Sequence, residues 1–364
     1  MTKIRDQLLA VVNGLVGDYL VRSQNALAIT ADFFVDGAPL PRTRAAFAAR
    51  DPQPSSRVVV LVHGLMGTER NWQPPVPRSA AVVAAAGAVS DDSAAPTGDA
   101  GPVDGMANDA PSELAAVPDF GARLANDHGF APYYVRYNSG QAIADSGVQL
   151  AALLQHLSEC YPVAITELLL VGHSMGGLVI RAACHHAAME QAAWLRIPMR
   201  AAYIGTPHRG APYERIGRVT ANLLGAINDP VTRLLASIAG LRSAGIQDLG
   251  DADVRHEDRG RRQPQLSLRD PRHPVPLLAT MQHLLIAGAI SDKAWLSALF
   301  GDSIVPLTSA RNDGGIDPHN VVTIAGITHM QMLHDPRVYT ALSKWLGTAP
   351  VPKSQHNSPT EPTQ

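Results

Sequence analysis

Apolar and polar positions follow two different periods along the chain. Short runs of apolar residues alternate with longer stretches in which apolar side chains recur every three or four positions. Such short runs are typical of strands buried on both faces, and their alternation with helices predicts an α/β fold with a mostly parallel sheet covered by helices on both sides. The runs are Arg57 to Val62, Tyr133 to Tyr137, Leu168 to Val171, Ala201 to Ile204, Leu284 to Ala287 and Val321 to Ala325.

Two stretches near the ends of the chain also show helical spacing. Residues 3–22 predict one amphipathic helix whose apolar face packs on the domain, with a membrane surface or a partner as the alternative contact. Near the other end, Asp335 can cap a helix that begins at Pro336, because proline suits the first helical turn. We therefore expect the α/β domain over residues 57–347, after an N-terminal helix and lead-in over residues 1–56.

Three segments depart from the alternation of strands and helices. Residues 74–111 consist largely of Ala, Gly, Pro, Ser and Asp, and residues 348–364 have a similar low-complexity character. Both bury too little apolar area to offset their ordering entropy and are expected to be disordered. Residues 211–274 show helical spacing between two strands, which predicts a helical cap or lid over the carboxyl edge of the sheet. A subdomain that serves only stability is the alternative.

The composition is that of a soluble globular protein. The chain has 364 residues, of which 46% are hydrophobic and 17% charged, and its formal net charge is -2. This balance gives no electrostatic reason to expect nucleic acid as a partner. The stretch from Leu8 to Leu20 is too short for a transmembrane segment and is followed by no signal-peptide cleavage site. We expect a cytoplasmic protein, with peripheral membrane contact through residues 3–22 left open.

Cysteines and histidines predict neither a disulfide framework nor a metal site. Cys160 and Cys184 are the only cysteines in the chain, so two unpaired thiols are expected. His185 and His186 are adjacent in a predicted helix and do not form the i, i+4 pair that binds zinc. We therefore expect no metal site there.

Polar residues occur where the predicted strands end. Ser174 lies between glycines after one strand, His329 follows the last strand, and Asp302 lies between them in the chain. The carboxyl ends of parallel strands meet at one edge of the sheet, where active sites form. A serine hydroxyl needs a base to become a strong nucleophile, and the base needs an acid to orient it. These residues therefore predict Ser174 as nucleophile, His329 as base and Asp302 as acid.

Other residues compete for the roles of acid and base. Asp292 lies closer to the end of its strand than Asp302, and Asp313 also lies downstream. His334 competes with His329, but it lies beside the predicted start of the last helix, where a surface or capping role is expected.

Backbone amides near Ser174 complete the predicted site. The glycines around Ser174 permit a sharp turn from strand to helix, and the helix presents the free amide of Met175 to the reacting oxygen. The amide of Leu65, in the loop after an earlier strand, is the expected second oxyanion donor. Four side chains around these loops either contact substrate or support loop geometry: His63, Met66, His173 and His208.

Five motifs resemble those of the α/β-hydrolase superfamily: HGLMG, GHSMGG, GTPHRGAP, GDSIVP and GITHMQMLHDPRVY. Within it, the chain is similar to bacterial lipase-like and esterase-like members related to the α/β domain of GPI inositol-deacylases. The resemblance spans about Arg57 to Leu346, apart from the low-complexity segment and a variable segment before the acid. It implies an eight-stranded, mostly parallel sheet, hydrolysis of carboxylic esters by a Ser-Asp-His triad, and no cofactor. GDSIVP matches the family's acid loop, which favours Asp302 over Asp292.

These observations predict a serine hydrolase of carboxylic esters that acts through an acyl-enzyme on Ser174. The expected substrate is a small-molecule or lipid ester with a medium or long acyl portion. Thioester hydrolysis or acyl transfer would use the same triad, and the sequence does not separate these reactions. A binding protein that has the hydrolase fold without activity is the alternative from another functional class.

Overall fold

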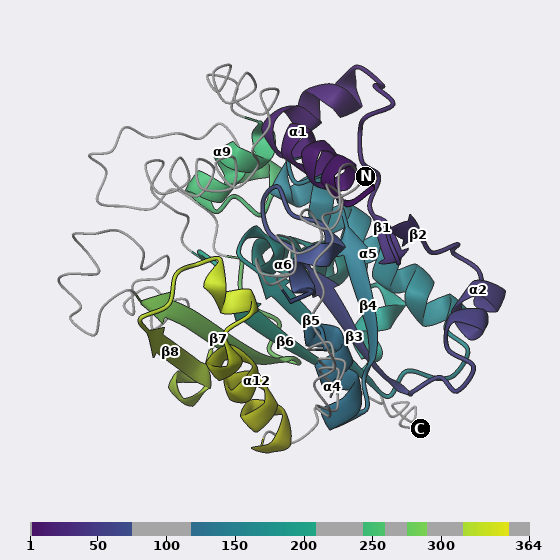
Figure 1. Cartoon of the computed structure of the whole chain (residues 1–364), viewed down its shortest axis with the longest axis vertical. Coiled ribbons are helices and arrows are strands. Elements are labelled where there is room, and N and C mark those ends of the chain that lie inside the picture. The colour runs from purple at the N-terminus through teal and green to yellow at the C-terminus, as the bar shows by residue number, and fades with distance from the viewer. Residues whose placement is uncertain (1, 75–117, 209–242, 259–274, 290–315, 349–364) are drawn as a thin grey trace, which may run out of the picture.

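The computed structural model of the chain describes residues 2–74, 118–208, 243–258, 275–289 and 316–348 (Figure 1). The predicted low-complexity segment and C-terminal tail lie almost entirely outside the described residues. Most of the predicted cap also lies outside them.

A single sheet forms the centre of the described structure. Its eight strands lie in the order β2-β1-β4-β3-β5-β6-β7-β8. The strands from β3 to β8 pair in parallel, whereas β1 is antiparallel to both of its neighbours. All six strands predicted from apolar runs are present. The strands are β1 (Asp32–Val35), β2 (Ala38–Pro39), β3 (Arg57–Val62), β4 (Ala131–Arg136), β5 (Glu167–His173), β6 (Met199–Ile204), β7 (Gln282–Ala289) and β8 (Val321–Ala325).

The sequence analysis did not predict the hairpin of β1 and β2. Its turn is Asp36-Gly37, and both residues have positive φ, 50° and 82° respectively. Asp-Gly between two short strands is a strong signal for a tight hairpin, because such turns need positive φ at both central positions. The stretch expected as a lead-in therefore supplies the edge of the sheet.

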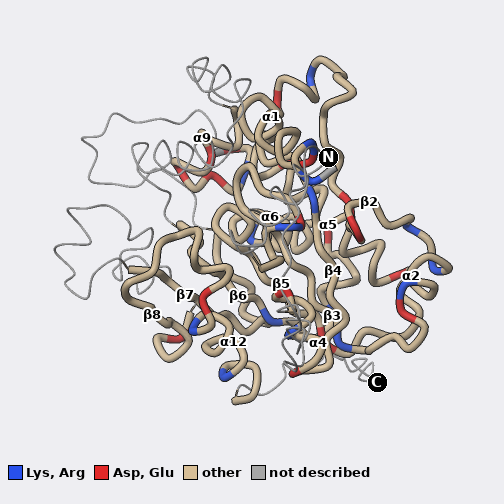
Figure 2. The backbone as a smooth tube through the Cα atoms, viewed as in Figure 1, with Lys and Arg blue, Asp and Glu red and all other residues tan. Residues whose placement is uncertain are grey.

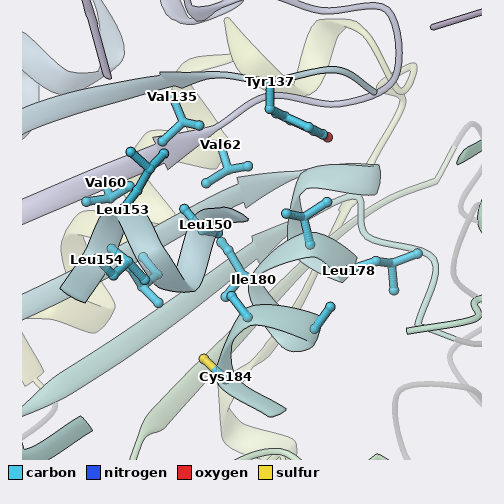
Figure 3. Packing of buried hydrophobic residues seen from close by; sticks show 14 of the residues in the cluster. Val60, Val62, Val135, Tyr137, Leu150, Leu153, Leu154, Leu178, Ile180 and Cys184 are labelled. Carbon is cyan, nitrogen blue, oxygen red and sulfur yellow. The ribbon is translucent and has the colours of Figure 1, made fainter. Parts of the chain in front are cut away.

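Helices cover both faces of the sheet. Successive side chains of a strand point to opposite faces, and Val58, Val60 and Val62 accordingly belong to one apolar cluster while Val59 and Leu61 belong to the other. Helices α5 and α6 pack into the first cluster (Figure 3), and α4 and α12 pack into the second. The α-helices are α1 (Thr2–Arg22), α2 (Arg44–Arg50), α4 (Phe120–His128), α5 (Ile143–Cys160), α6 (Met175–Met189), α9 (Ala244–Asp251) and α12 (Pro336–Thr348).

Local signals account for the ends of several helices. The Asp119 carboxylate accepts the N–H of Ala122 at the start of α4, and Gly129 ends that helix at a φ of 68°. Helix α12 begins at Pro336, as predicted, and the Asp335 carboxylate accepts the N–H of Arg337 at 2.9 Å.

Short 3-10 helices lie at η1 (Glu69–Trp72), η2 (Ala193–Arg196), η3 (His256–Asp258), η4 (Pro318–Asn320) and η5 (Gln331–Leu333).

The sheet has the arrangement of the α/β-hydrolase fold. The chain turns sharply from β5 into α6, and the loop after β3 lies at the same edge of the sheet, which is where this fold holds its nucleophile and an oxyanion loop. The strand register aligns the ends of the central strands, since His173 pairs with Ile204 and Ile204 pairs with Ile286. The loops that follow these strands therefore meet.

Positive and negative residues are mixed along the described chain, in agreement with its small formal net charge. Figure 2 shows Lys and Arg interspersed with Asp and Glu along the described chain. Among the described helices, none combines the length and the apolar character needed to cross a membrane.

Candidate active site

Ser174 occupies a strained turn between β5 and α6. Its φ of 54° and ψ of -125° lie in a region that non-glycine residues rarely adopt. Such a conformation costs on the order of 1–3 kcal/mol and persists only where the surroundings enforce it. Two backbone hydrogen bonds hold this turn, because the Ser174 N–H donates to Ile204 O at 2.8 Å and the Gly177 N–H donates to Ser174 O at 3.1 Å.

The neighbouring glycines make the turn sterically feasible. A Cβ added to Gly172 would lie 2.6 Å from Gly177 Cα, and one added to Gly176 would lie 2.3 Å from Val62 O. Both distances are too short for any side chain, so β5, α6 and β3 approach this closely only because these positions are glycine.

His329 lies at the same edge of the sheet, in the loop between β8 and η5. Its ring stacks on that of His173, the residue before Ser174, with ring centroids 4.7 Å apart. A Cβ added to Gly205 would lie 3.0 Å from His329 Nδ1, and the preceding residue, Ile204, accepts the Ser174 N–H. These contacts bring the predicted nucleophile and base to neighbouring positions.

The environment of His329 suits a base. Burial and the neighbouring His173 hold its pKa well below the usual 6.5, so the imidazole is neutral at physiological pH. Its Nδ1 atom is buried and has no hydrogen-bond partner among the described residues. A buried nitrogen without a partner is costly, and this atom is where an orienting acid would bind.

Asp302 and its competitors Asp292 and Asp313 all lie outside the described residues. The competing base His334 is exposed at the end of η5, where its N–H donates to Gln331 O at 2.9 Å. That position, directly before the cap of α12, is where the sequence analysis expected it.

The loop after β3 lies against Ser174. A Cβ added to Gly64 would be 3.0 Å from Ser174 Cβ. In the same loop the Met66 N–H donates to Ser139 Oγ at 2.9 Å, whereas the Leu65 N–H has no acceptor in the described part of the chain. The Met175 N–H opens α6 and so has no acceptor within its own helix. Leu65 and Met175 thus both have an amide without an acceptor next to the predicted nucleophile, among the described residues.

His63 supports the geometry of this loop. Its Nδ1–H donates to Gly64 O at 2.8 Å, its Nε2 accepts the Tyr137 N–H at 3.3 Å, and its ring stacks on the Tyr137 ring. The Tyr137 hydroxyl donates back to His63 O at 3.0 Å. Burial lowers the pKa of His63 to about 4, which keeps the ring neutral and able to accept at Nε2. Both ring nitrogens are occupied, so neither is left for a substrate.

His173 contacts the predicted base directly. Its Nε2–H donates to the backbone oxygen of His329 at 3.3 Å, and burial lowers its pKa to about 4. This bond and the ring stacking fix the position of His329. Of the two roles predicted for His173, substrate contact or support of loop geometry, these contacts favour support.

His208 is tied to helix α6 through Arg181. Arg181 Nη1 donates to His208 Nδ1 at 3.1 Å and to its backbone oxygen at 3.2 Å. Burial and the Arg181 charge hold the pKa of His208 well below its usual value. Sequence analysis did not identify Arg181, because its partner lies 27 residues away and no local pattern indicates the contact.

The described residues offer no cluster of three or more His, Cys, Asp or Glu side chains that could hold a metal ion.

Of the comparisons with known proteins, the one with solved structures is the one that finds matches. No family model and no curated protein sequence matches the chain. Among solved structures, it is similar to the mature lipase BlEst2 of Bacillus licheniformis, with 14% identity, a TM-score of 0.42, and 81% of this chain and 92% of that chain covered. It is also similar to a putative aryl esterase from Burkholderia cenocepacia, with 16% identity, a TM-score of 0.38, and 82% and 91% covered. The order and pairing of the strands, together with the turn at Ser174, place the chain in the α/β-hydrolase fold.

Proposed function

We propose that the protein is a serine hydrolase that cleaves carboxylic esters through an acyl-enzyme on Ser174. The observation that carries this proposal is the setting of Ser174, a strained residue at the start of α6 with the loop after β3 in contact with it. Strain of this kind in a serine with glycines two positions away on either side has no evident structural use, and a sharp turn from strand to helix is how the α/β-hydrolase fold places a nucleophile at the edge of its sheet.

In the first half of the proposed reaction, Ser174 Oγ attacks the carbonyl carbon of the ester. His329 takes the serine proton, and the carbonyl oxygen becomes an oxyanion that accepts hydrogen bonds from the N–H groups of Leu65 and Met175. Each such donor contributes on the order of 3–4 kcal/mol to stabilising the transition state. The tetrahedral intermediate then expels the alcohol, to which His329 returns the proton, and leaves an acyl group on Ser174.

Water completes the reaction by the same route. His329 takes a proton from a water molecule, whose oxygen attacks the acyl carbon, and a second oxyanion forms against the same amides. Collapse of this intermediate breaks the bond to Ser174 Oγ, releases the carboxylic acid and returns the proton to the serine. A base must be unprotonated before each attack, and the lowered pKa of His329 keeps its ring neutral for that step.

The third member of the proposed triad is Asp302. Nδ1 of His329 is buried without a partner among the described residues, so a carboxylate there would satisfy it and stabilise the imidazolium that forms during catalysis. Asp302 is favoured because its GDSIVP motif resembles the acid loop of α/β-hydrolases. A carboxylate at this position would also raise the pKa of His329 towards neutrality.

The substrate proposed from the sequence is an ester with a medium or long acyl group. The resemblance to lipase-like proteins and to GPI inositol-deacylases supports it. An esterase that prefers short acyl groups would use the same residues, so acyl length is tested separately below.

Labelling with a fluorophosphonate probe tests the nucleophile. The wild-type protein should be modified at Ser174, and Ser174→Ala should lose labelling and reduce kcat for esters by roughly a millionfold. The control is Ser158→Ala, since Ser158 lies on α5 and its hydroxyl donates to Gln155 O. A folded wild-type protein that is not labelled at Ser174 would instead favour a binding protein without activity.

Hydrolysis of nitrophenyl esters of increasing acyl length tests the substrate class. A higher kcat/KM for medium or long acyl groups than for acetate supports the lipase-like proposal. Preference for acetate would contradict the acyl-length proposal and leave the esterase intact. Product analysis with added alcohol or thioester then separates hydrolysis from acyl transfer and thioester cleavage.

A further inference from the structure

Helix α1 contacts the loop that supplies the proposed oxyanion donor Leu65. The Gln7 side-chain amide donates from Nε2 to Met66 O at 3.1 Å. Gly14 lies against the Met66 side chain, because a Cβ added there would be 2.4 Å from Met66 Cγ. The side chain of Met66 is fully buried. The N-terminal helix therefore reaches the edge of the sheet where the nucleophile lies.

Met66 needs this support because its backbone is strained. Its φ is 57°, in the left-handed region that long side chains rarely adopt. The Gln7 side chain donates to the Met66 oxygen, and Ser139 Oγ accepts the Met66 N–H at 2.9 Å. The Met66 side chain packs against Gly14 of α1. The Met66 N–H belongs to the peptide that joins it to Leu65, and the Met66 oxygen belongs to the peptide that joins it to Gly67. With both groups bonded, the peptides on either side of Met66 have fixed orientations, which sets the backbone conformation of Met66 and the direction in which the chain leaves Leu65.

Helix α1 is itself bonded to the other loops at this edge. It departs from helical geometry at Val16, and on either side of that residue Gly14 O accepts from Ser243 Oγ at 2.7 Å while Gly17 O accepts from Asn138 Nδ2 at 3.1 Å. Asn138 directly precedes Ser139. Helix α1 is thus hydrogen-bonded to the residue next to Ser139, which itself accepts the Met66 N–H.

An ion-pair cluster anchors the first turns of the same helix. Asp6 lies 3.2 Å from Arg136 at the end of β4 and 3.6 Å from Arg70. Arg136 in turn binds Glu69, which follows the oxyanion loop in the chain. Gln7 is next to Asp6, so the cluster sets where the Gln7 amide lies.

We propose that α1 is a positioning element of the active site, in which Gln7, together with Ser139, holds Met66 in its left-handed conformation and so keeps the Leu65 N–H available to the oxyanion. This inference rests on the proposed function. Gln7 acts through Met66 and does not touch substrate. Helix α1, predicted from the sequence to pack on the domain, thus also affects the rate of catalysis.

The oxyanion is absent from the ground-state ester and develops on the way to the tetrahedral intermediate, so this role predicts a specific kinetic signature. Gln7→Met keeps the length of the side chain but removes the donor. It should lower kcat for nitrophenyl esters between about 10-fold and 100-fold with little change in KM, because misorienting an oxyanion donor weakens transition-state binding alone. Gln7→Glu should lose at least as much, since its carboxylate cannot donate to Met66 O. Gln7→Lys should recover most of the rate, because it restores a donor.

A trifluoromethyl ketone supplies the second measurement. Such a ketone forms a tetrahedral adduct with the serine whose oxygen occupies the oxyanion position, so its inhibition constant should rise in Gln7→Met by the same factor as kcat falls. The control is Arg22→Met, at the far end of α1, where the arginine pairs only with Asp18 on the surface among the described residues. Active sites are counted by fluorophosphonate titration at low temperature, so that unfolded molecules do not enter the rate.

The outcomes separate the two proposals. If wild-type protein fails to react at Ser174, the proposed function is wrong. If wild-type protein reacts, and Gln7→Met and Gln7→Glu match Arg22→Met in kcat and in the ketone inhibition constant, the role of Gln7 is wrong. A lowered melting temperature with unchanged kinetic constants would make Gln7 a structural contact only and would also overturn the inference.

Discussion

At the scale of single residues, the candidate site depends on two strained backbones. Ser174 and Met66 both have positive φ without being glycine. Each is held by backbone groups or side chains that are distant in sequence: Ile204 O for Ser174, and Gln7 and Ser139 for Met66. Strain of this kind concentrates at functional sites because the surrounding fold must maintain it.

The residue scale also carries the prediction for the acid. Asp302→Asn should reduce kcat on the order of 10⁴-fold, because an amide that donates towards Nδ1 of His329 stabilises the wrong tautomer of the base. The measurement is turnover of a nitrophenyl ester at saturating substrate, after circular dichroism has shown that the variant is folded. Asp292→Asn is the matched control and should keep its activity. The reverse result would assign the role to Asp292.

At the scale of elements, the loops of the active edge are fastened by buried polar contacts. Arg136, at the end of β4, binds both carboxylate oxygens of Glu69 at 2.6 Å, and the two side chains are only 6% and 7% exposed. This pair joins a strand of the sheet to the 3-10 helix η1, which directly follows the oxyanion loop. The position of the Arg136–Glu69 pair is therefore linked to the oxyanion loop and, through Asp6, to helix α1.

Removing one partner of this pair should destabilise the protein strongly. Glu69→Gln leaves the buried charge of Arg136 with Asp6 as its one carboxylate partner among the described residues, and breaking a buried pair in this way costs about 3–5 kcal/mol. Urea denaturation would measure the change in the free energy of unfolding. Asp18→Asn is the control, because it breaks an exposed pair with Arg22 and should cost less than about 1 kcal/mol. Equal effects of the two substitutions would contradict the prediction.

At the scale of the whole molecule, burial keeps several histidines neutral. Burial lowers the pKa of His63 and His173 to about 4, and it holds the pKa of His208 and His329 well below the usual value. All four side chains are less than a tenth exposed. The folded protein therefore binds fewer protons than the unfolded chain in mildly acidic solution.

Stability should accordingly fall as the pH is lowered from 6.5 to about 4. In that window the unfolded chain protonates its histidines near pH 6.5, whereas His63 and His173 in the folded protein stay neutral until about pH 4. Each of these two residues should contribute on the order of 3 kcal/mol over the full window. Denaturant titrations at several pH values would measure the slope, and His63→Asn should reduce it. A free energy of unfolding that is constant between pH 6.5 and 4.5 would contradict this account.

Much of the fold could be predicted because its signals are local. Apolar runs predicted six strands, Asp335 and Pro336 predicted the start of α12, and the glycines around Ser174 predicted a sharp turn after β5. The hairpin of β1 and β2 was missed because its strands are too short to show periodicity, although Asp36-Gly37 is a recognisable hairpin turn. The acid and most of the cap lie outside the described residues, so these parts of the prediction stay predictions.

By itself, the sequence determined six of the eight strands of the sheet and the chemical identity of the candidate nucleophile and base, because periodicity and glycine spacing act within a few residues. Only the tertiary structure decided how these residues are supported. The contact of Gln7 with Met66 joins residues 59 positions apart, and that of Ser139 with Met66 joins residues 73 apart. Such contacts depend on how helices and loops pack around the sheet, so no local pattern in the sequence indicates them.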